Sequence, residues 1–183
     1  RDLHSFPTRR SSDLSGYAVY WMVVNAFGIS ITTFVGQNYG AGKVKRMRKS
    51  VGICLGMSYA GAILVSGALY ALAGPLYRLF TTDENVVRIG VDMMHFLLPS
   101  YFMYVVIGIL SGALRGAGRV LVPMLLTCGG VCLIRVVWMF GVFPGHPGIN
   151  TIMLSYPVSW GITAVLFIIY YFRKFPKVKN VQE

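Results

Sequence analysis

The sequence predicts an all-α membrane protein, a polytopic bundle of transmembrane helices. Of the 183 residues, 55% are hydrophobic and only 13% are charged, and the mean hydropathy is +0.62. A water-soluble domain of this size rarely has such a composition. Apolar stretches of about 20 residues, enough to cross a bilayer core about 30 Å thick, alternate with short polar connections. These stretches are about twice as long as barrel strands and lack their period-two alternation, which favours helices.

Five spans are expected in this bundle. They run approximately over residues 15–36, 51–73, 93–114, 120–143 and 149–172. Aromatic residues lie near several of the expected ends, among them Tyr20 and Trp21, and we interpret them as interfacial anchors. Gly108, Gly112 and Gly116 recur at every fourth residue, which predicts a small-residue groove where another helix approaches closely.

The placement of the basic residues predicts the orientation of the chain. Arg78 and Arg88 belong to one set of alternate connections. The other set holds Lys43, Lys45, Arg46, Arg48, Lys49, Arg115, Arg119, Arg173, Lys174, Lys177 and Lys179. Because cytoplasmic loops are enriched in Lys and Arg, we expect a multi-pass protein of the cell membrane, in bacteria the cytoplasmic membrane, with a cytoplasmic C-terminus. The net charge of +11 is then explained by contact with membrane lipids, and no nucleic acid partner is expected.

Residues 1–14, RDLHSFPTRRSSDL, differ from the rest of the chain. They are polar and Arg-rich and lack the apolar core of a signal peptide. The part FPTRRSSDL looks like the conceptual translation of a common sequencing adapter, so we expect an artefact here and assign residues 15–183 to the fold. A genuine basic cytoplasmic arm is the alternative. An adapter-like start also predicts that helices upstream of residue 15 are missing.

Two of the expected cytoplasmic turns share a Gly-Ala-Gly-basic pattern, GQNYGAGK at 36–43 and GALRGAGR at 112–119. Glycine adopts positive backbone angles readily, so both patterns predict tight reversals between helices. Nucleotide binding is not indicated. A P-loop requires Gly where Gln37 stands and a hydroxyl residue where Val44 stands, and no strand precedes either turn.

These turns, with LFTTDENVVRIG between them, resemble the C-terminal half of the multidrug and toxic compound extrusion (MATE) family, over essentially residues 15–172. The signature positions that carry the resemblance are Gly36, Gln37, Gly40 and Gly42 in the first turn and Leu114, Arg115, Gly116 and Gly118 in the second. The resemblance implies helices eight to twelve of a twelve-helix transporter with two lobes. It further implies export of cationic or amphiphilic small molecules in exchange for sodium ions or protons, by a protein that is monomeric at full length.

Coupling to an ion gradient requires an acidic group at membrane depth. Asp92 stands at the expected outer start of the third span, where we favour a first-turn acid that complements the helix dipole over a proton relay. In one branch of the family an acidic residue occupies the position of Tyr104. This departure argues against a coupling site in this half, and the resemblance to other branches implies an acid on a missing helix. We expect no metal site and no cofactor apart from the coupling ion.

Two further polar residues, Arg135 and Asn25, lie within the expected spans, and together with Tyr104 and Asp92 they are the four candidate residues of the substrate or ion pathway. Arg135 either snorkels to the outer headgroups or belongs to the cavity or to an inter-helix pair. Asn25 can line the transport pathway, although a hydrogen bond between helices is favoured. Arg135 also leaves open a second function, a flippase for lipid-linked saccharides. An enzyme is not expected, because the sequence places no nucleophile with a base and no metal cluster at membrane depth.

Overall fold

The computed structural model describes residues 8–79, 81–145 and 148–175, with side chains from Tyr20 onward except at residues 149 and 150. Every element within these residues is helical, as predicted. In chain order they are α1 (Thr8–Gly40), α2 (Val44–Arg78), α3 (Glu84–Leu97), the 3-10 turn η1 (Leu98–Ser100), α4 (Tyr101–Gly116), α5 (Leu121–Thr127), the π-helical segment η2 (Cys128–Leu133), α6 (Ile134–Gly141) and α7 (Ile149–Lys174).

These elements form long rods that match the predicted spans. Within the described residues, four rods are long and apolar enough to cross a membrane: Val44–Arg78, Glu84–Gly116, Leu121–Gly141 and Thr151–Lys174. α1 is not among them, but its side chains are described only from Tyr20. Its backbone is helical from Thr8, so it extends into the residues that the sequence excluded from the fold. The expectation that residues 1–14 are not part of the fold stays a prediction.

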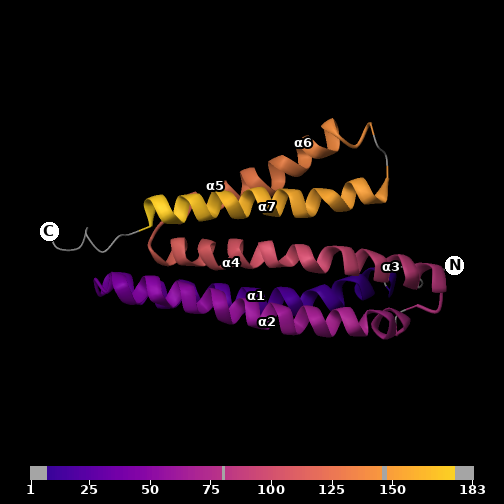
Figure 1. Cartoon of the computed structure of the whole chain (residues 1–183), viewed down its shortest axis with the longest axis horizontal. Helices are drawn as coiled ribbons and strands as arrows, with labels where there is room; N and C mark the ends of the chain where they lie inside the picture. Colours follow the sequence, from indigo (N-terminus) through magenta and orange to yellow (C-terminus); the bar gives the residue numbers. More distant parts are fainter. Residues whose placement is uncertain (1–7, 80, 146–147, 176–183) are drawn as a thin grey trace.

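The rod α3–η1–α4 is the centre of the bundle. Figure 1 shows α1 and α2 along one side of it and α7 along the other, with α5 and α6 outside α7 and α6 diverging from it. In α4, Val105, Ile109 and Ala113 are fully buried on one face, and Ile107, about 200° from Val105 around the helix, is only 2% exposed. Burial of this kind on both faces of one helix indicates a rod surrounded by protein rather than by lipid.

The glycine groove predicted on α4 is confirmed, and α1 occupies it. A Cβ atom on Gly116 would lie 2.4 Å from the Thr32 carbonyl oxygen, and one on Gly112 would lie 2.6 Å from the Gly28 carbonyl oxygen. The Thr32 hydroxyl donates to the Gly28 carbonyl at 2.7 Å and also lies 3.1 Å from the Gly112 carbonyl. Only residues without a side chain permit two helix backbones to approach this closely. We call this contact the α1–α4 seam.

The two Gly-Ala-Gly turns have the same geometry. Gly42 has φ +68° and Gly118 has φ +77°, the positive angles that the pattern predicts. The Lys43 amide donates to the Asn38 carbonyl at 2.8 Å, and the Arg119 amide donates to the Leu114 carbonyl at 3.0 Å. The amide of each positive-φ glycine donates to the carbonyl three residues earlier. Both are Schellman motifs, which end one helix and satisfy its last carbonyl groups.

The larger of the two sets of basic residues lies at one end of this bundle. Figure 1 shows the α1–α2 turn, the α4–α5 turn and the end of α7 together at that end, on the left of the view. The Arg119 guanidinium donates to the Tyr170 hydroxyl at 3.0 Å and so links two of these segments. Lys177 and Lys179 lie outside the described residues. The charge segregation is therefore a property of the fold, while the assignment of this end to the cytoplasm stays a prediction.

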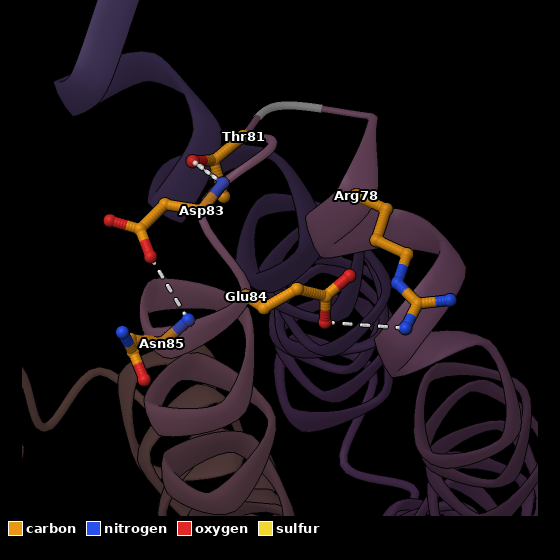
Figure 2. A network of polar contacts seen from close by, with 5 residues as sticks. All are labelled: Arg78, Thr81, Asp83, Glu84 and Asn85. Carbon is orange, nitrogen blue, oxygen red and sulfur yellow. Dashed lines mark hydrogen bonds and ion pairs between the residues drawn. The ribbon is translucent and has the colours of Figure 1, made fainter.

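The helix ends correct one expectation about Asp92. The Asp83 side chain caps α3 by accepting from the Asn85 amide at 3.0 Å, and Glu84 forms an exposed ion pair with Arg78 at 3.3 Å (Figure 2). α3 therefore begins at Glu84 rather than near residue 93, and Asp92 lies more than two turns inside it. The interpretation of Asp92 as a first-turn acid is wrong. The first turn already has an acidic residue, Glu84, that complements the dipole.

Candidate functional site: a polar pocket beside an aromatic cluster

A pocket of about 270 Å³ lies between α1, α4 and the end of α5. We call it the polar pocket. Its lining consists of Val24, Asn25, Gly28, Ile29, Tyr104, Ile107, Gly108, Ser111, Arg115 and Thr127. The structure thus brings together Asn25 and Tyr104, two of the four residues that the sequence places in the pathway, and adds Arg115 from a signature turn. Gly28 and Gly108, where α1 and α4 approach closely, are part of this lining.

Asn25 is the polar group of α1 that remains available in this pocket. Its side chain is exposed and makes no hydrogen bond within the described part of the chain, so the favoured inter-helix bond is not found there. By contrast, the hydroxyls of Ser30 and Thr33 on the same helix bond to the carbonyls of Ala26 and Ile29. An amide without a partner at membrane depth is costly unless water or a ligand reaches it.

Tyr104 connects the pocket to a cluster of aromatic rings contributed by three helices. The cluster consists of Tyr20 and Trp21 of α1, Tyr101 and Tyr104 of α4, and Tyr156 and Trp160 of α7. We call it the aromatic cluster. The rings of Trp21 and Tyr104 meet edge to face with centroids 4.3 Å apart. Such pairs each contribute about 0.5–1.5 kcal/mol beyond the burial of their area.

The buried core of this cluster is Tyr20, Tyr101 and Trp160. Tyr20 stacks on Tyr101 at 4.7 Å and donates its hydroxyl hydrogen to the Tyr101 carbonyl at 3.0 Å. Trp160 contacts the ring of Tyr101 at 5.4 Å and is itself only 4% exposed. The interpretation of Tyr20 as an interfacial anchor is therefore wrong, since the side chain is fully buried. Tyr20 and Tyr101 are 81 residues apart in the chain, so no local sequence pattern indicates their contact.

Arg135 lies against the aromatic cluster and outside the polar pocket. Its guanidinium carbon is 4.1 Å from the centre of the Tyr156 ring and 5.6 Å from that of Trp160. Its Nε donates to the Ser159 hydroxyl at 3.2 Å. The sequence left open whether Arg135 snorkels to the headgroups or pairs with another helix. In the structure it contacts another helix. Sequence reasoning found Arg135 but missed Ser159, Tyr156 and Trp160, whose spacing of three and four residues on one helix face was the available signal.

Asp92 is separate from both sites. It is exposed and lines a cavity of about 430 Å³ at the opposite end of the bundle from the basic turns. The other lining residues of that cavity are Gly74, Arg78, Glu84, Asn85, Val87, Arg88 and Val91. Neither the polar pocket nor the aromatic cluster has a carboxylate among its described residues.

The remaining signature residues act through backbone geometry. Gly36 packs against the Gly116 carbonyl, where an added Cβ would lie at 3.4 Å, and Gly40 has open space around it. Gln37 is exposed and Leu114 is fully buried. Gly42 and Gly118, with their positive backbone angles, follow the ends of α1 and α4. Arg115, in the last turn of α4, lines the polar pocket.

Comparisons of the sequence with known proteins identify a family and several relatives. A family model described as MatE matches residues 13–140. The Arabidopsis thaliana protein DETOXIFICATION 7 is 30% identical over 105 residues, which are 57% of this chain and 21% of the relative. The probable multidrug resistance protein YoeA of Bacillus subtilis is 22% identical over 149 residues, 80% of this chain and 32% of the relative. Human multidrug and toxin extrusion protein 1 is 23% identical over 155 residues, 82% of this chain and 27% of the relative. The chain thus spans about a fifth to a third of these relatives.

Proposed function

This chain belongs to the MatE family, and we propose that it forms part of a membrane transporter that extrudes amphiphilic or cationic small molecules in exchange for sodium ions or protons. The observation that carries the proposal is the polar pocket, where an unpartnered Asn25 and the ring of Tyr104 line a space within a bundle of membrane-spanning length. The names of the relatives, which refer to multidrug resistance and to toxin extrusion, support the substrate class.

The pocket and the cluster suit an amphiphile. Asn25, Ser111 and Thr127 offer polar groups on one side, while the rings beside Tyr104 offer apolar and π surfaces on the other. Flat hydrophobic molecules and cations both bind such ring faces. A pocket with few directional groups accepts many molecules, as multidrug export requires.

The proposed mechanism is alternating access, in which two lobes rock about a central cavity. The α1–α4 seam, with backbones in direct contact, would make this chain move as one body. Because the described parts of the two sites have no carboxylate, we place the acid that couples transport to the ion gradient in a part of the transporter outside this chain. We further propose that the transporter works as a monomer within membrane lipids.

The test is efflux of a cationic dye by the full-length transporter in cells without other drug exporters. We expect Tyr104→Ala and Asn25→Ala to lower kcat/KM for ethidium about tenfold, which corresponds to about 1.4 kcal/mol of transition-state binding. Thr33→Ala is the matched control, because its hydroxyl bonds to its own helix and does not line the pocket. Imposed sodium and proton gradients then identify the coupling ion.

The alternative, a flippase for lipid-linked saccharides, gives a different result in the same cells. A flippase would leave ethidium inside and would move a fluorescent lipid-linked sugar across the membrane. Efflux of ethidium that is unchanged by both pocket substitutions would contradict the proposed site.

A further inference from the structure

Arg135 has a charge in a membrane-spanning rod and has no acidic partner there. It is the fifteenth residue of the apolar rod Leu121–Gly141, about 20 Å from the start of that rod at about 1.5 Å per residue. The ion pair found in the described part of the chain is the distant one between Arg78 and Glu84. A positive charge at such a depth costs at least about 2.5 kcal/mol on insertion scales when it is unpaired. A compensating group is therefore required.

Part of this compensation comes from α7. Tyr156 lies over the face of the guanidinium at 4.1 Å, and Trp160 lies near it at 5.6 Å. On the edge of the group, Nε donates to the Ser159 hydroxyl, which in turn donates to the Tyr156 carbonyl at 3.0 Å. Ser159 is fully buried, so the contact is fixed by packing. The guanidinium is thus held on one face and one edge by side chains of a single helix.

The opposite edge of the guanidinium remains available. The two terminal nitrogens have no hydrogen-bond partner among the described residues. They are also not buried, because the buried side-chain donors and acceptors without partners in this part of the chain are the hydroxyls of Ser58 and Ser66 alone. Stacking uses the face of a guanidinium and leaves its in-plane N–H groups free. Two such N–H groups side by side can donate to two oxygens of a carboxylate or a phosphate.

The π-helical segment η2 determines that the Arg135 side chain points toward α7. η2 ends at Leu133, two residues before Arg135, and a π turn inserts about one extra residue into an α-helix. Without it, every following side chain would be rotated by about 100° around the rod. Gly130 within η2 contacts Thr163 of α7, where an added Cβ would lie 2.2 Å from the Thr163 hydroxyl oxygen. The rod is therefore wound so that it meets α7 closely and Arg135 points at Ser159.

We propose that Arg135, held by Tyr156, Trp160 and Ser159, is an oxyanion-binding subsite that receives the carboxylate of amphiphilic substrates. The inference rests on the proposed function and narrows its substrate class to molecules that combine an aromatic or cationic body with a negative group. The rings of the aromatic cluster contact the body, and the free edge of Arg135 contacts the carboxylate. A lipid phosphate has the same chemistry, so the experiment separates the two sources.

The experiment measures equilibrium binding of two dyes to the purified full-length transporter in maltoside detergent, by fluorescence anisotropy. Rhodamine 110 has a free carboxylate, and rhodamine 123 is its methyl ester, so the pair differs at this group alone. We expect Arg135→Gln to weaken binding of rhodamine 110 about tenfold or more and to leave rhodamine 123 within about twofold. Arg135→Lys retains the charge but not the paired N–H groups of the guanidinium, so it should weaken binding of rhodamine 110 to an intermediate extent.

Arg88→Gln is the control for charge. It removes one arginine from the exposed surface of α3 and should leave both affinities unchanged. Thermal stability of each variant, followed by size-exclusion chromatography, shows whether the fold is retained. The inference would be overturned if Arg135→Gln weakened the binding of both dyes equally. It would also be overturned if this substitution left the affinity for rhodamine 110 unchanged.

The source of the oxyanion follows from a repeat with added phosphatidylglycerol. If the Arg135-dependent binding of rhodamine 110 persists, the substrate carboxylate is the occupant. If the lipid displaces the dye from the wild type but has no effect on Arg135→Gln, the oxyanion subsite stands and its occupant is the lipid phosphate. Binding does not require transport, so a wild type that binds the acid through Arg135 but exports neither dye refutes the proposed function alone.

Discussion

The α1–α4 seam and the rod α5–η2–α6 differ in how much of each is buried and in what their glycines face. In the apolar window of Glu84–Gly116, 61% of the residues are buried against the rest of the chain, whereas the figure for Leu121–Gly141 is 11%. Gly112 and Gly116 face backbone atoms of α1, while Gly129 of η2 has open space around it. Figure 1 shows the same contrast, with α4 between its neighbours and α6 diverging from α7.

This difference indicates which part of the molecule is rigid. Two backbones in contact leave no side chain that can change rotamer, so the seam has few ways to rearrange. The α5–η2–α6 rod is attached mainly through α7, and exposed apolar residues such as Leu125, Leu133 and Phe140 cover its outer surface. We expect α1, α4 and α7 to hold the polar pocket and the aromatic cluster in place, and the outer rod to respond most to lipid.

The largest effect should come from closing the groove of the seam. Replacing both Gly112 and Gly116 by Ala puts methyl groups 2.6 Å and 2.4 Å from carbonyl oxygens of α1, which have no rotamer to change. At about 1–3 kcal/mol for each overpacked site, the pair should lower the free energy of unfolding by about 3 kcal/mol or more. Thermal denaturation of the full-length protein in detergent, followed by size-exclusion chromatography, measures the loss.

The matched control is the pair Gly52→Ala and Gly56→Ala in α2, where no atom lies within 4 Å of the added methyl groups. These changes should be neutral or stabilise by about 0.5–1 kcal/mol each, because Ala favours the helix. Seam substitutions that behave like this control would show that α1 and α4 are not in direct contact in the intact transporter.

Much of this fold follows from local signals. Apolar length predicts the rods, and glycine at every fourth residue predicts the groove, because both patterns depend on helix geometry alone. The Gly-Ala-Gly turns predict positive φ at Gly42 and Gly118 for the same reason. The positions of the helix ends were less predictable, because α3 begins at a polar cap, Asp83, well outside its apolar stretch.

The candidate site was predictable only in part. Asn25 and Tyr104 stand out as polar groups in apolar spans, and the structure places both in one pocket. Tyr20 did not stand out, because an aromatic residue near a span end is typical of an interfacial anchor, and its burial depends on Tyr101 and on α7. The π segment also lacks a local signal beyond Gly129 and Gly130, since its winding depends on contact with Thr163.

A smaller effect is expected where the outer rod meets α7. In Gly130→Ala the added methyl group lies 2.2 Å from the Thr163 hydroxyl oxygen, which itself donates to the Ser159 carbonyl at 2.6 Å. Because the outer rod can move away from α7, we expect a loss of about 1–2 kcal/mol rather than misfolding. Thermal stability in detergent gives this value, and rhodamine 110 binding should weaken too, as Arg135 moves with the rod.

Gly129→Ala is the neighbouring control and should leave both stability and dye binding unchanged, since no atom lies within 4 Å of its added methyl group. Thr163→Ala combined with Gly130→Ala should recover part of the loss, and the double-mutant cycle isolates the contact. A loss in Gly130→Ala as large as that in the seam variant would mean that the outer rod is held as rigidly as α4.

The smallest effect should come from the two turns, and it should be equal in both. Gly42→Ala and Gly118→Ala each place a side chain at positive φ, which costs about 1 kcal/mol whatever the surrounding space. Gly42 joins α1 to α2 and Gly118 joins the seam to the outer rod, so equal losses in thermal stability would show that the cost is local. Asn, which tolerates the left-handed region, should recover part of each loss. A much larger loss at Gly118 would instead show that strain in the α4–α5 turn is transmitted into the α1–α4 seam. The seam and the α5–η2–α6 rod would then be coupled through this turn.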